Sequence, residues 1–187
     1  MYEKADECYG YKAGDEIIAA GEHYYVIADS PATKDYVVAL KSDFLTFAEV
    51  NSYSSGVPVS ANNTNGYGAI LFGSTNDYST SYIKTVIETW WTDKFSNSEL
   101  KEVDGYRARL ITKSEAEAFR CSSSGWSCSK FISGYPNIYW TMTSANNTNH
   151  VFTVFHYIHP AGYNSGTNKY LVRPVINVYK SSIQKIQ

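Results

Sequence analysis

Short apolar runs dominate the N-terminal part of the chain and predict strands. Residues 16–20 and 23–28 are apolar segments of strand length separated by Gly21, and residues 35–40 form another after a Ser-Pro-Ala-Thr turn. Residues 106–111 alternate apolar and polar positions and predict a strand after the turn at Asp104 and Gly105. Residues 171–179 are apolar enough for a central strand, but Pro174 cannot donate a ladder hydrogen bond. We therefore expect Pro174 at a strand start, a bulge or an edge.

Helical spacing appears in the middle of the chain. The clearest helix is predicted by apolar residues that recur near every third or fourth position, preceded by capping candidates at 79–81: Ile83, Val86, Ile87, Trp90 and Phe95. We expect Trp90 in the core of this amphipathic helix rather than on a ligand platform. Thr112 and Glu115 form a capping box that predicts a second helix through Phe119. A short helix is also expected to start at 96–100.

The connecting segments are long and polar. Residues 1–15 predict a loose N-terminal segment, and residues 50–76 predict mostly loop, with one short apolar run at 69–72. A loop of that length in a compact domain is usually functional or mobile. The hexapeptide Ser-Ala-Asn-Asn-Thr-Asn occurs at 60–65 and again at 144–149, either as a repeat or as a coincidence between Asn/Thr-rich loops.

Charge is distributed unevenly, although the net charge is only −2. All acidic residues lie at or before Glu117, and residues 118–187 carry six scattered basic residues. The two halves are therefore expected to attract one another weakly, and no nucleic-acid interface is expected. The 187 residues fit a single domain spanning 1–187. No apolar run is long enough to span a membrane and no signal peptide is visible, so we expect no membrane contact by this segment.

Three cysteines leave two redox interpretations open. Cys121 and Cys128 enclose a Ser/Gly-rich loop around Trp126 and form either a local disulfide or two free thiols, with Cys8 left over. A metal-binding Cys-x-x-Cys pair is absent from the sequence.

The sequence offers little support for catalysis or a cofactor. His150, His156 and His159 lie near one another, but no nucleophile signature accompanies them. On an extended strand His156 and His159 would face opposite ways, so exposed or partly packed histidines are favoured over a metal site. The acid-free C-terminal part excludes paired-carboxylate chemistry there and would make any calcium site weak. We expect no catalytic residues, no metal and no cofactor.

Three segments carry a resemblance to a known family: LKEVDGYRARLIT at 100–112, YWTM at 139–142 and VRPVINVYKS at 172–181. They resemble a bacterial and phage domain with a C-type-lectin-like fold, related to formylglycine-generating enzymes and to variable proteins of diversity-generating retroelements. The resemblance covers residues 15–182 and is weakest at 44–78. It implies an α+β fold with twisted antiparallel sheets, two helices and long irregular loops.

The same resemblance implies a variable ligand-binding region at 135–170. Retroelements miscopy template adenines, so Asn codons become codons for Tyr, Ser, Thr, His and several others, but never for Lys, Glu, Gln, Met or Trp. Between 135 and 170 only Lys169, Trp140 and Met142 belong to this forbidden set, and 21 of the 36 residues are Tyr, Asn, Ser, Thr or His. Ordinary drift in a related binding domain remains the alternative.

Two activities of the wider family are not carried over. The calcium-binding Glu-Pro-Asn and Trp-Asn-Asp patterns of animal C-type lectins are absent, and Tyr135-Pro136-Asn137 lacks the acid. Cys121 and Cys128 precede the region that holds the catalytic cysteine pair of formylglycine-generating enzymes.

We therefore predict a binding domain that displays a Tyr/Asn/Ser/His-rich surface to a protein or cell-surface ligand, on a bacterial surface, in secreted form or on a phage particle. The buried scaffold is expected to comprise Trp140, Val151, Val154, Val172, Val175 and Ile176. Arg173 is expected to be structural, paired with a carboxylate or a carbonyl, and any carboxylate partner must come from residues 1–117. The alternatives are a structural pilin-like or virion subunit, an enzyme related to the formylglycine-generating group, and a calcium-dependent lectin.

The candidate contact residues share side chains typical of recognition surfaces, in which Tyr supplies stiff contact area and Asn and Ser supply adaptable hydrogen bonds. They are Tyr135, Asn137, Asn146, Asn147, Asn149, His150, Thr153, Phe155, His156, Tyr157, His159, Tyr163, Asn164, Thr167, Asn168 and Tyr170.

Overall fold

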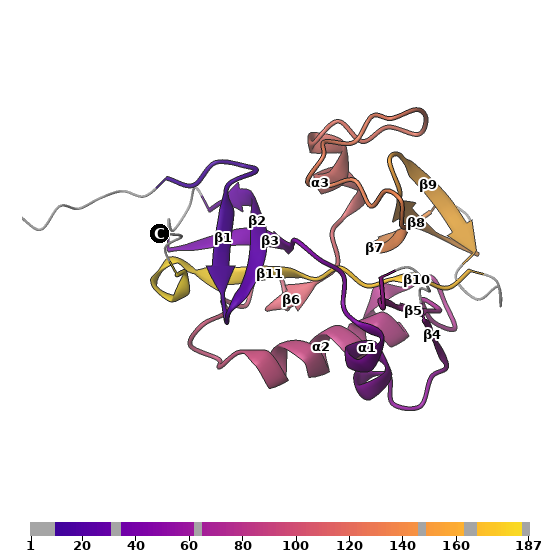
Figure 1. Cartoon of the computed structure of the whole chain (residues 1–187), viewed down its shortest axis with the longest axis horizontal. Coiled ribbons are helices and arrows are strands. Elements are labelled where there is room, and N and C mark those ends of the chain that lie inside the picture. The colour runs from indigo at the N-terminus through magenta and orange to yellow at the C-terminus, as the bar shows by residue number, and fades with distance from the viewer. Residues whose placement is uncertain (1–9, 31–34, 62–64, 146–148, 163–167, 185–187) are drawn as a thin grey trace, which may run out of the picture.

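The structure is a computed structural model that describes residues 10–30, 35–61, 65–145, 149–162 and 168–184. These residues form two β-sheets and three α-helices, so the α+β class is confirmed (Figure 1). The sheets lie at opposite ends of the molecule, and a segment near the C-terminus runs from one to the other (Figure 1). Among the described residues, no helix is both long enough and apolar enough to cross a bilayer.

The first sheet contains all the strands predicted in the N-terminal part. Its order is β1 (Glu16–Ala19), β2 (Glu22–Asp29), β3 (Tyr36–Lys41), β11 (Val175–Tyr179) and β6 (Ala108–Arg109), with every neighbouring pair antiparallel. The turn between β1 and β2 places Ala20 and Gly21 at φ 48° and 76°, a geometry that glycine adopts without strain. β11 is central, as predicted from its apolar sequence, whereas β6 is shorter than the predicted strand at 106–111.

The second sheet is built mainly from the uncharged C-terminal part. Its order is β4 (Val59–Ala61), β5 (Gly68–Ile70), β10 (Tyr170–Leu171), β7 (Tyr139–Ser144), β8 (His150–Val154) and β9 (Ile158–Gly162). The pair β10–β7 is parallel, with Leu171 opposite Tyr139, and the other pairs are antiparallel. β8 and β9 form a hairpin at one end of this sheet, and its turn carries the sequence Phe155-His156-Tyr157.

Two helices begin at the capping residues that the sequence predicts. α2 (Tyr82–Lys94) begins after Ser81, whose hydroxyl accepts from the Lys84 N–H, and it buries the predicted apolar face, including Trp90. α3 (Lys113–Ala118) begins after Thr112, whose hydroxyl accepts from the Glu115 N–H. Both predicted helices are therefore confirmed, and Trp90 belongs to the core.

Of two predictions about the middle of the chain, one was incomplete and the other was wrong. The segment 50–76 is mostly irregular, as predicted, but it also contributes β4, β5 and the last four residues of α1 (Phe47–Tyr53), which begins at a capping box of Thr46 and Glu49. α1 has only one buried side chain, Val50, so it shows no apolar periodicity. Residues 96–100 form a turn instead of a helix, since the Glu99 carboxylate accepts from the Ser96 N–H and the chain then leaves toward β11.

The link between the sheets is the run from β10 to β11, which Pro174 interrupts. Pro174 lies immediately before β11, at a strand start as predicted, and its carbonyl accepts from the Lys41 N–H. The carbonyl of Val172 accepts from the Leu45 N–H on the same run. The strand pairing of β10 in the second sheet therefore ends before Pro174, and that of β11 in the first sheet begins after it. Between the two strands the chain stays hydrogen-bonded to Lys41 and Leu45.

Arg173 lies at this junction and is 3% exposed. Its guanidinium donates to four backbone carbonyls, those of Lys41, Ser42, Phe131 and Ile132, over distances of 2.7–3.2 Å. It has no carboxylate partner among the described residues. The prediction of a structural arginine with carbonyl partners is confirmed, and it joins the acidic half of the chain to the acid-free half through carbonyls.

The predicted scaffold residues are fully buried: Trp140, Val151, Val154, Val172, Val175 and Ile176 are each 0% exposed. The Trp140 indole N–H donates to the Ile70 carbonyl at 2.8 Å, and its ring packs edge-on against Phe72 and Tyr170. Trp140 thereby ties β7 to β5 across the second sheet.

Candidate functional site

Aromatic rings from three separate segments gather beside the β8–β9 turn. We call this group the aromatic platform and define it as Trp126, Tyr135, Phe155, His156 and Tyr157. The rings of Trp126 and His156 are stacked, with centroids 3.9 Å apart and an interplanar angle of 10°. Tyr135 lies edge-on to Trp126 at 4.6 Å and within 5.4 Å of Phe155, and Tyr157 lies 4.8 Å from His156. The five rings form one continuous cluster.

Two rings of the platform are open to solvent. Trp126 is 70% exposed and Tyr135 is 55% exposed. In the described part of the chain the one other large apolar side chain classed as exposed is Phe47, at 36%. Isolated exposed apolar residues are common and need no explanation, but two adjacent ones stacked on further aromatic rings form a patch, which is typical of an interaction site.

A disulfide holds the Trp126 loop against the platform. Cys121 and Cys128 are bonded, which settles the two redox interpretations in favour of the disulfide. The N–H groups of Ser127 and Cys128 donate to the His156 carbonyl at 3.1 and 3.2 Å, and the Ile158 N–H donates to the Ser122 carbonyl at 2.7 Å. The loop is therefore fixed to both sides of the β8–β9 turn, which sets Trp126 over the His156 ring.

The segment that carries Tyr135 is held equally closely. The Gly134 N–H and the Ser133 hydroxyl both donate to the Phe155 carbonyl, at 2.6 and 3.1 Å. A Cβ atom on Gly134 would lie 2.7 Å from the Asn137 carbonyl oxygen and 2.9 Å from the Tyr139 ring, so only glycine fits. The close backbone approach at Gly134 places Tyr135 next to Phe155.

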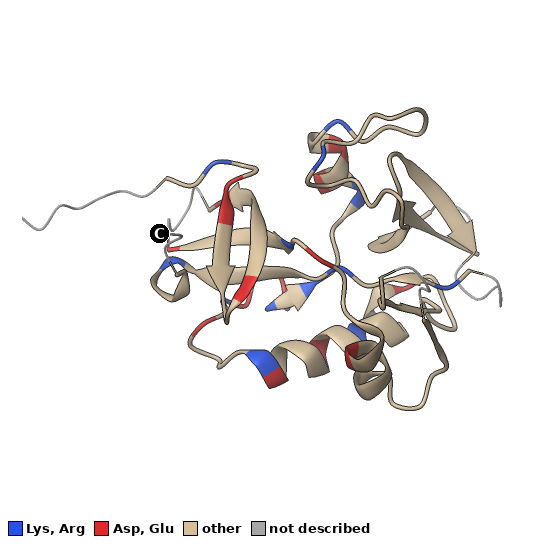
Figure 2. Ribbon diagram, viewed as in Figure 1, with Lys and Arg blue, Asp and Glu red and all other residues tan. Residues whose placement is uncertain are grey.

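Four of the five platform rings, all but Trp126, lie in a stretch of the sequence without charged residues. No Asp, Glu, Lys or Arg occurs from residue 131 to residue 168, and the ribbon of β7, β8 and β9 is free of both charged colours in Figure 2. Recognition through this surface would rest on aromatic contact and neutral hydrogen bonds rather than on charge.

The structure brings together several of the predicted contact residues. Tyr135, Phe155, His156 and Tyr157 belong to the platform, and His159 lies 5.5 Å from the Tyr157 ring. Burial lowers the pKa of His159, whose Nδ1 lies 2.9 Å from the Thr153 hydroxyl. Asn137 lies at the side of the platform, in the cleft described below.

Other predicted contact residues lie elsewhere. Asn149 and His150 lie at the opposite end of the β8–β9 hairpin from its turn, since His150 pairs with Gly162. Asn168 donates to the Gly162 carbonyl, and Tyr170 is partly buried against Trp140. Five further candidates lie outside the described residues: Asn146, Asn147, Tyr163, Asn164 and Thr167.

Thr153 was wrongly predicted as a contact residue. It is 0% exposed, and its hydroxyl is engaged by the Nδ1 atom and the carbonyl of His159. The strand alternation of β8 explains this, because Thr153 follows the half-buried Phe152 and faces into the sheet.

Trp126 is the platform residue that sequence reasoning missed as a contact residue. Its signal was present: a large aromatic residue in the middle of a Ser/Gly-rich loop between two cysteines has no periodic partners with which to pack. Only the fold places this loop beside the β8–β9 turn.

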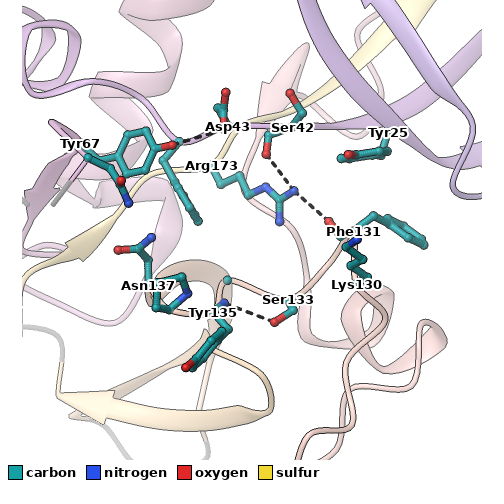
Figure 3. Close-up of a pocket in the computed structure, with 14 residues that line it drawn as sticks. Tyr25, Ser42, Asp43, Tyr67, Lys130, Phe131, Ser133, Tyr135, Asn137 and Arg173 are labelled. Carbon is teal, nitrogen blue, oxygen red and sulfur yellow. Dashed lines mark hydrogen bonds between the residues drawn. The ribbon is translucent and has the colours of Figure 1, made fainter.

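A cleft of about 560 Å³ opens beside the platform, between the chain that follows β3 and the segment that precedes β7 (Figure 3). Arg173 lies in its floor, and Tyr135 belongs to both cleft and platform. The remaining lining residues are Tyr25, Ser42, Asp43, Phe44, Asn65, Tyr67, Lys130, Phe131, Ser133, Gly134, Pro136 and Asn137.

The positive charge of Arg173 acts on the pKa of two neighbouring tyrosines. Burial raises the pKa of Tyr139, and the guanidinium acts in the opposite direction through its positive charge and a hydrogen bond. Burial, together with the adjacent Asp43 carboxylate, raises the pKa of Tyr67, and again Arg173 opposes the shift. The floor of the cleft is therefore electropositive, while Asp43 makes one part of its rim negative.

The chain matches no family model, no curated protein and no solved structure. The interpretation of the site therefore rests on its own geometry. Within the described ranges, no group of three or more His, Cys, Asp or Glu residues could hold a metal ion. His156 is stacked beneath Trp126 and His159 is bonded to Thr153, so these two histidines have separate structural partners.

Proposed function

We propose that this chain is a ligand-binding domain that recognises a protein partner through the aromatic platform. The observation that carries the proposal is the pairing of Trp126 and Tyr135, which are 70% and 55% exposed with ring centroids 4.6 Å apart. Tryptophan and tyrosine are the residues most enriched at the energetic centres of protein interfaces.

The way the platform is held supports this function. Ordering an exposed side chain on binding costs free energy, and a side chain already fixed in the free protein avoids most of that cost. The Trp126 ring is stacked on His156, and its loop is closed by the Cys121–Cys128 disulfide and bonded to the β8–β9 turn. The platform is thus preorganised for contact, and its lack of charge leaves specificity to shape and neutral hydrogen bonds.

We further propose that the fold is C-type-lectin-like and that a diversity-generating retroelement varies the 135–170 region. The motifs at 100–112, 139–142 and 172–181 support the first point, because they fall on β6, β7 and β11, three strands of the buried scaffold. The second point is supported by four platform rings at Tyr135, Phe155, His156 and Tyr157, all residue types that a miscopied Asn codon can encode. The setting that suits such a protein is a bacterial surface, a secreted protein or a phage particle.

The retroelement proposal is tested in the genome. We expect a reverse-transcriptase gene close to this gene, together with a near-copy of the segment encoding 135–170 that differs only where the copy has adenine. A near-copy with differences spread over all four bases would contradict diversification, without affecting the platform itself.

The binding proposal is tested with Trp126→Ala. Random twelve-residue peptides displayed on phage would be selected on the immobilised wild-type chain, and the affinities of the enriched peptides would then be measured as synthetic peptides. We expect Trp126→Ala to weaken them by roughly 30-fold or more, the loss typical of an interface hot spot. The melting temperature should hardly change, because the side chain is mostly exposed.

Phe47→Ala is the matched control, since Phe47 is the other exposed large apolar side chain of the described chain and lies on α1, outside the platform. It should leave peptide affinity unchanged. Peptides that bind Trp126→Ala as tightly as the wild type, or that are lost only with Phe47→Ala, would show that the platform is not the recognition surface.

A further inference from the structure

The cleft beside the platform contains charges of both signs that the protein does not neutralise. Asp43 and Lys130 are exposed and come from different walls, one from the chain after β3 and the other from the segment before β7 (Figure 3). Among the described residues neither belongs to an ion pair, and the one hydrogen bond to the Asp43 side chain is that of the Tyr67 hydroxyl, at 3.3 Å.

Arg173 adds a buried positive charge beneath the same cleft. Its Nε, Nη1 and Nη2 atoms make four hydrogen bonds to carbonyls, while a guanidinium has five N–H donors. The Tyr139 hydroxyl forms a further hydrogen bond with the guanidinium, and no carboxylate of the described residues forms an ion pair with it. Carbonyl dipoles stabilise the cation without cancelling it, so an anion that enters the cleft gains Coulomb energy.

The walls of the cleft are mainly aromatic. The rings of Tyr25, Tyr67 and Tyr135 line it together with Phe44 and Phe131, and Tyr25 packs against Phe131 at 5.8 Å. At about 560 Å³ the cleft has the size of a small-molecule site, which typically combines apolar walls with a few placed polar groups.

We propose that this cleft binds a small zwitterion of the amino-acid or dipeptide class. The ammonium group lies against Asp43, the carboxylate lies at Lys130 above Arg173, and an aromatic or aliphatic side chain packs between the tyrosine rings. The site goes beyond the proposed function, because it shares only Tyr135 with the platform and needs no peptide partner there.

The size and polarity of the site select this class over others. A simple anion would leave Asp43 facing it, with like-charge repulsion, and a simple cation would meet the positive floor at Arg173. A ligand with one charge of each sign pairs with both walls at once. Each pairing is a hydrogen bond between charged groups, which is stronger than one between neutral groups.

The test is an NMR titration of the isotope-labelled chain with the dipeptide Ala-Phe and with free phenylalanine. We expect saturable shifts of backbone amides lining the cleft, among them those of Asp43, Lys130 and Asn137, with at least one of the two probes. N-acetyl-Ala-Phe lacks the ammonium group and Ala-Phe amide lacks the carboxylate, and each should bind about tenfold or more weakly than Ala-Phe.

Two variants test which charged group of the dipeptide lies against Asp43 and which lies against Lys130. Asp43→Asn should weaken Ala-Phe binding about tenfold and leave the already weak binding of the N-acetyl form unchanged. Lys130→Met should likewise weaken Ala-Phe binding about tenfold and leave the already weak binding of Ala-Phe amide unchanged. The matched controls are Asp104→Asn and Lys12→Met, which remove an exposed acid and an exposed lysine outside the cleft and should have no effect.

Trp126→Ala separates this proposal from the platform. It alters no residue that lines the cleft, so Ala-Phe affinity should be unchanged even where selected peptides are lost. The proposal is overturned if neither probe shifts the cleft amides, if the shifts map to the platform instead, or if the blocked dipeptides bind as well as Ala-Phe. None of these results would count against peptide binding by the platform.

Discussion

Replacing Arg173 with methionine is expected to lower the free energy of unfolding by about 3 kcal/mol or more, since each buried carbonyl left without a partner costs about 1–3 kcal/mol. Methionine fills similar space but donates nothing, so the carbonyls of Lys41, Ser42 and Phe131 lose this donor, and that of Ile132 keeps the Tyr139 hydroxyl. Urea unfolding followed by far-ultraviolet circular dichroism measures the loss.

The position of Arg173 explains why the effect should be large. The carbonyls it holds belong to the end of β3, to the residue after it and to the segment before β7, so its removal loosens the junction between the two sheets. Arg173→Lys keeps the charge but not the planar fork of donors, and it should recover only a small part of the loss. Arg120→Met, at an exposed arginine, is the control and should change the free energy of unfolding by no more than about 0.5 kcal/mol. A small effect of Arg173→Met would show that the carbonyls find water instead.

Replacing Trp140 with alanine is expected to lower the free energy of unfolding by about 3–5 kcal/mol, the range for a large aromatic side chain removed from a packed core. Trp140 is 0% exposed, packs on Phe72 and Tyr170, and donates its indole N–H to the Ile70 carbonyl. The same unfolding measurement applies.

Two further substitutions separate the contributions of the Trp140 ring, of its N–H group and of its burial. Trp140→Phe keeps a ring but loses the N–H, so it should show an intermediate loss of about 1–3 kcal/mol from the unsatisfied Ile70 carbonyl and the smaller volume. Trp126→Ala makes the same chemical change at a tryptophan that is 70% exposed, and it should leave stability within about 0.5 kcal/mol. Equal losses at the two tryptophans would contradict the assignment of Trp140 to the scaffold and Trp126 to the surface.

The predicted elements that the structure confirms were those with strong local signals. α2 carries its apolar residues at helical spacing behind the Ser81 cap, and β2, β3 and β11 are dense in apolar residues. α1 was missed because one buried residue, Val50, gives no period, and its helix depends on packing against β5 and α2.

The candidate site was recovered only in part. Tyr135, Phe155, His156 and Tyr157 were predicted from composition, and the structure places them in one cluster. Composition could not separate them from Thr153, which is buried, because the face on which a strand residue lies depends on the register of the sheet. It also gave no reason to join Trp126 to His156, 30 positions away in sequence.

By itself the sequence determined the apolar strands β1, β2, β3 and β11, the capped helices, the apolar scaffold around Trp140 and the absence of charge from 131 to 168, because these depend on local period, capping chemistry and composition. Only the tertiary structure decided that Arg173 rests on carbonyls from both halves of the chain, that the Cys121–Cys128 loop docks on the β8–β9 turn, and that Asp43 and Lys130 share a cleft. These features join segments far apart in sequence, and their geometry follows from strand pairing and loop docking, which no local pattern encodes.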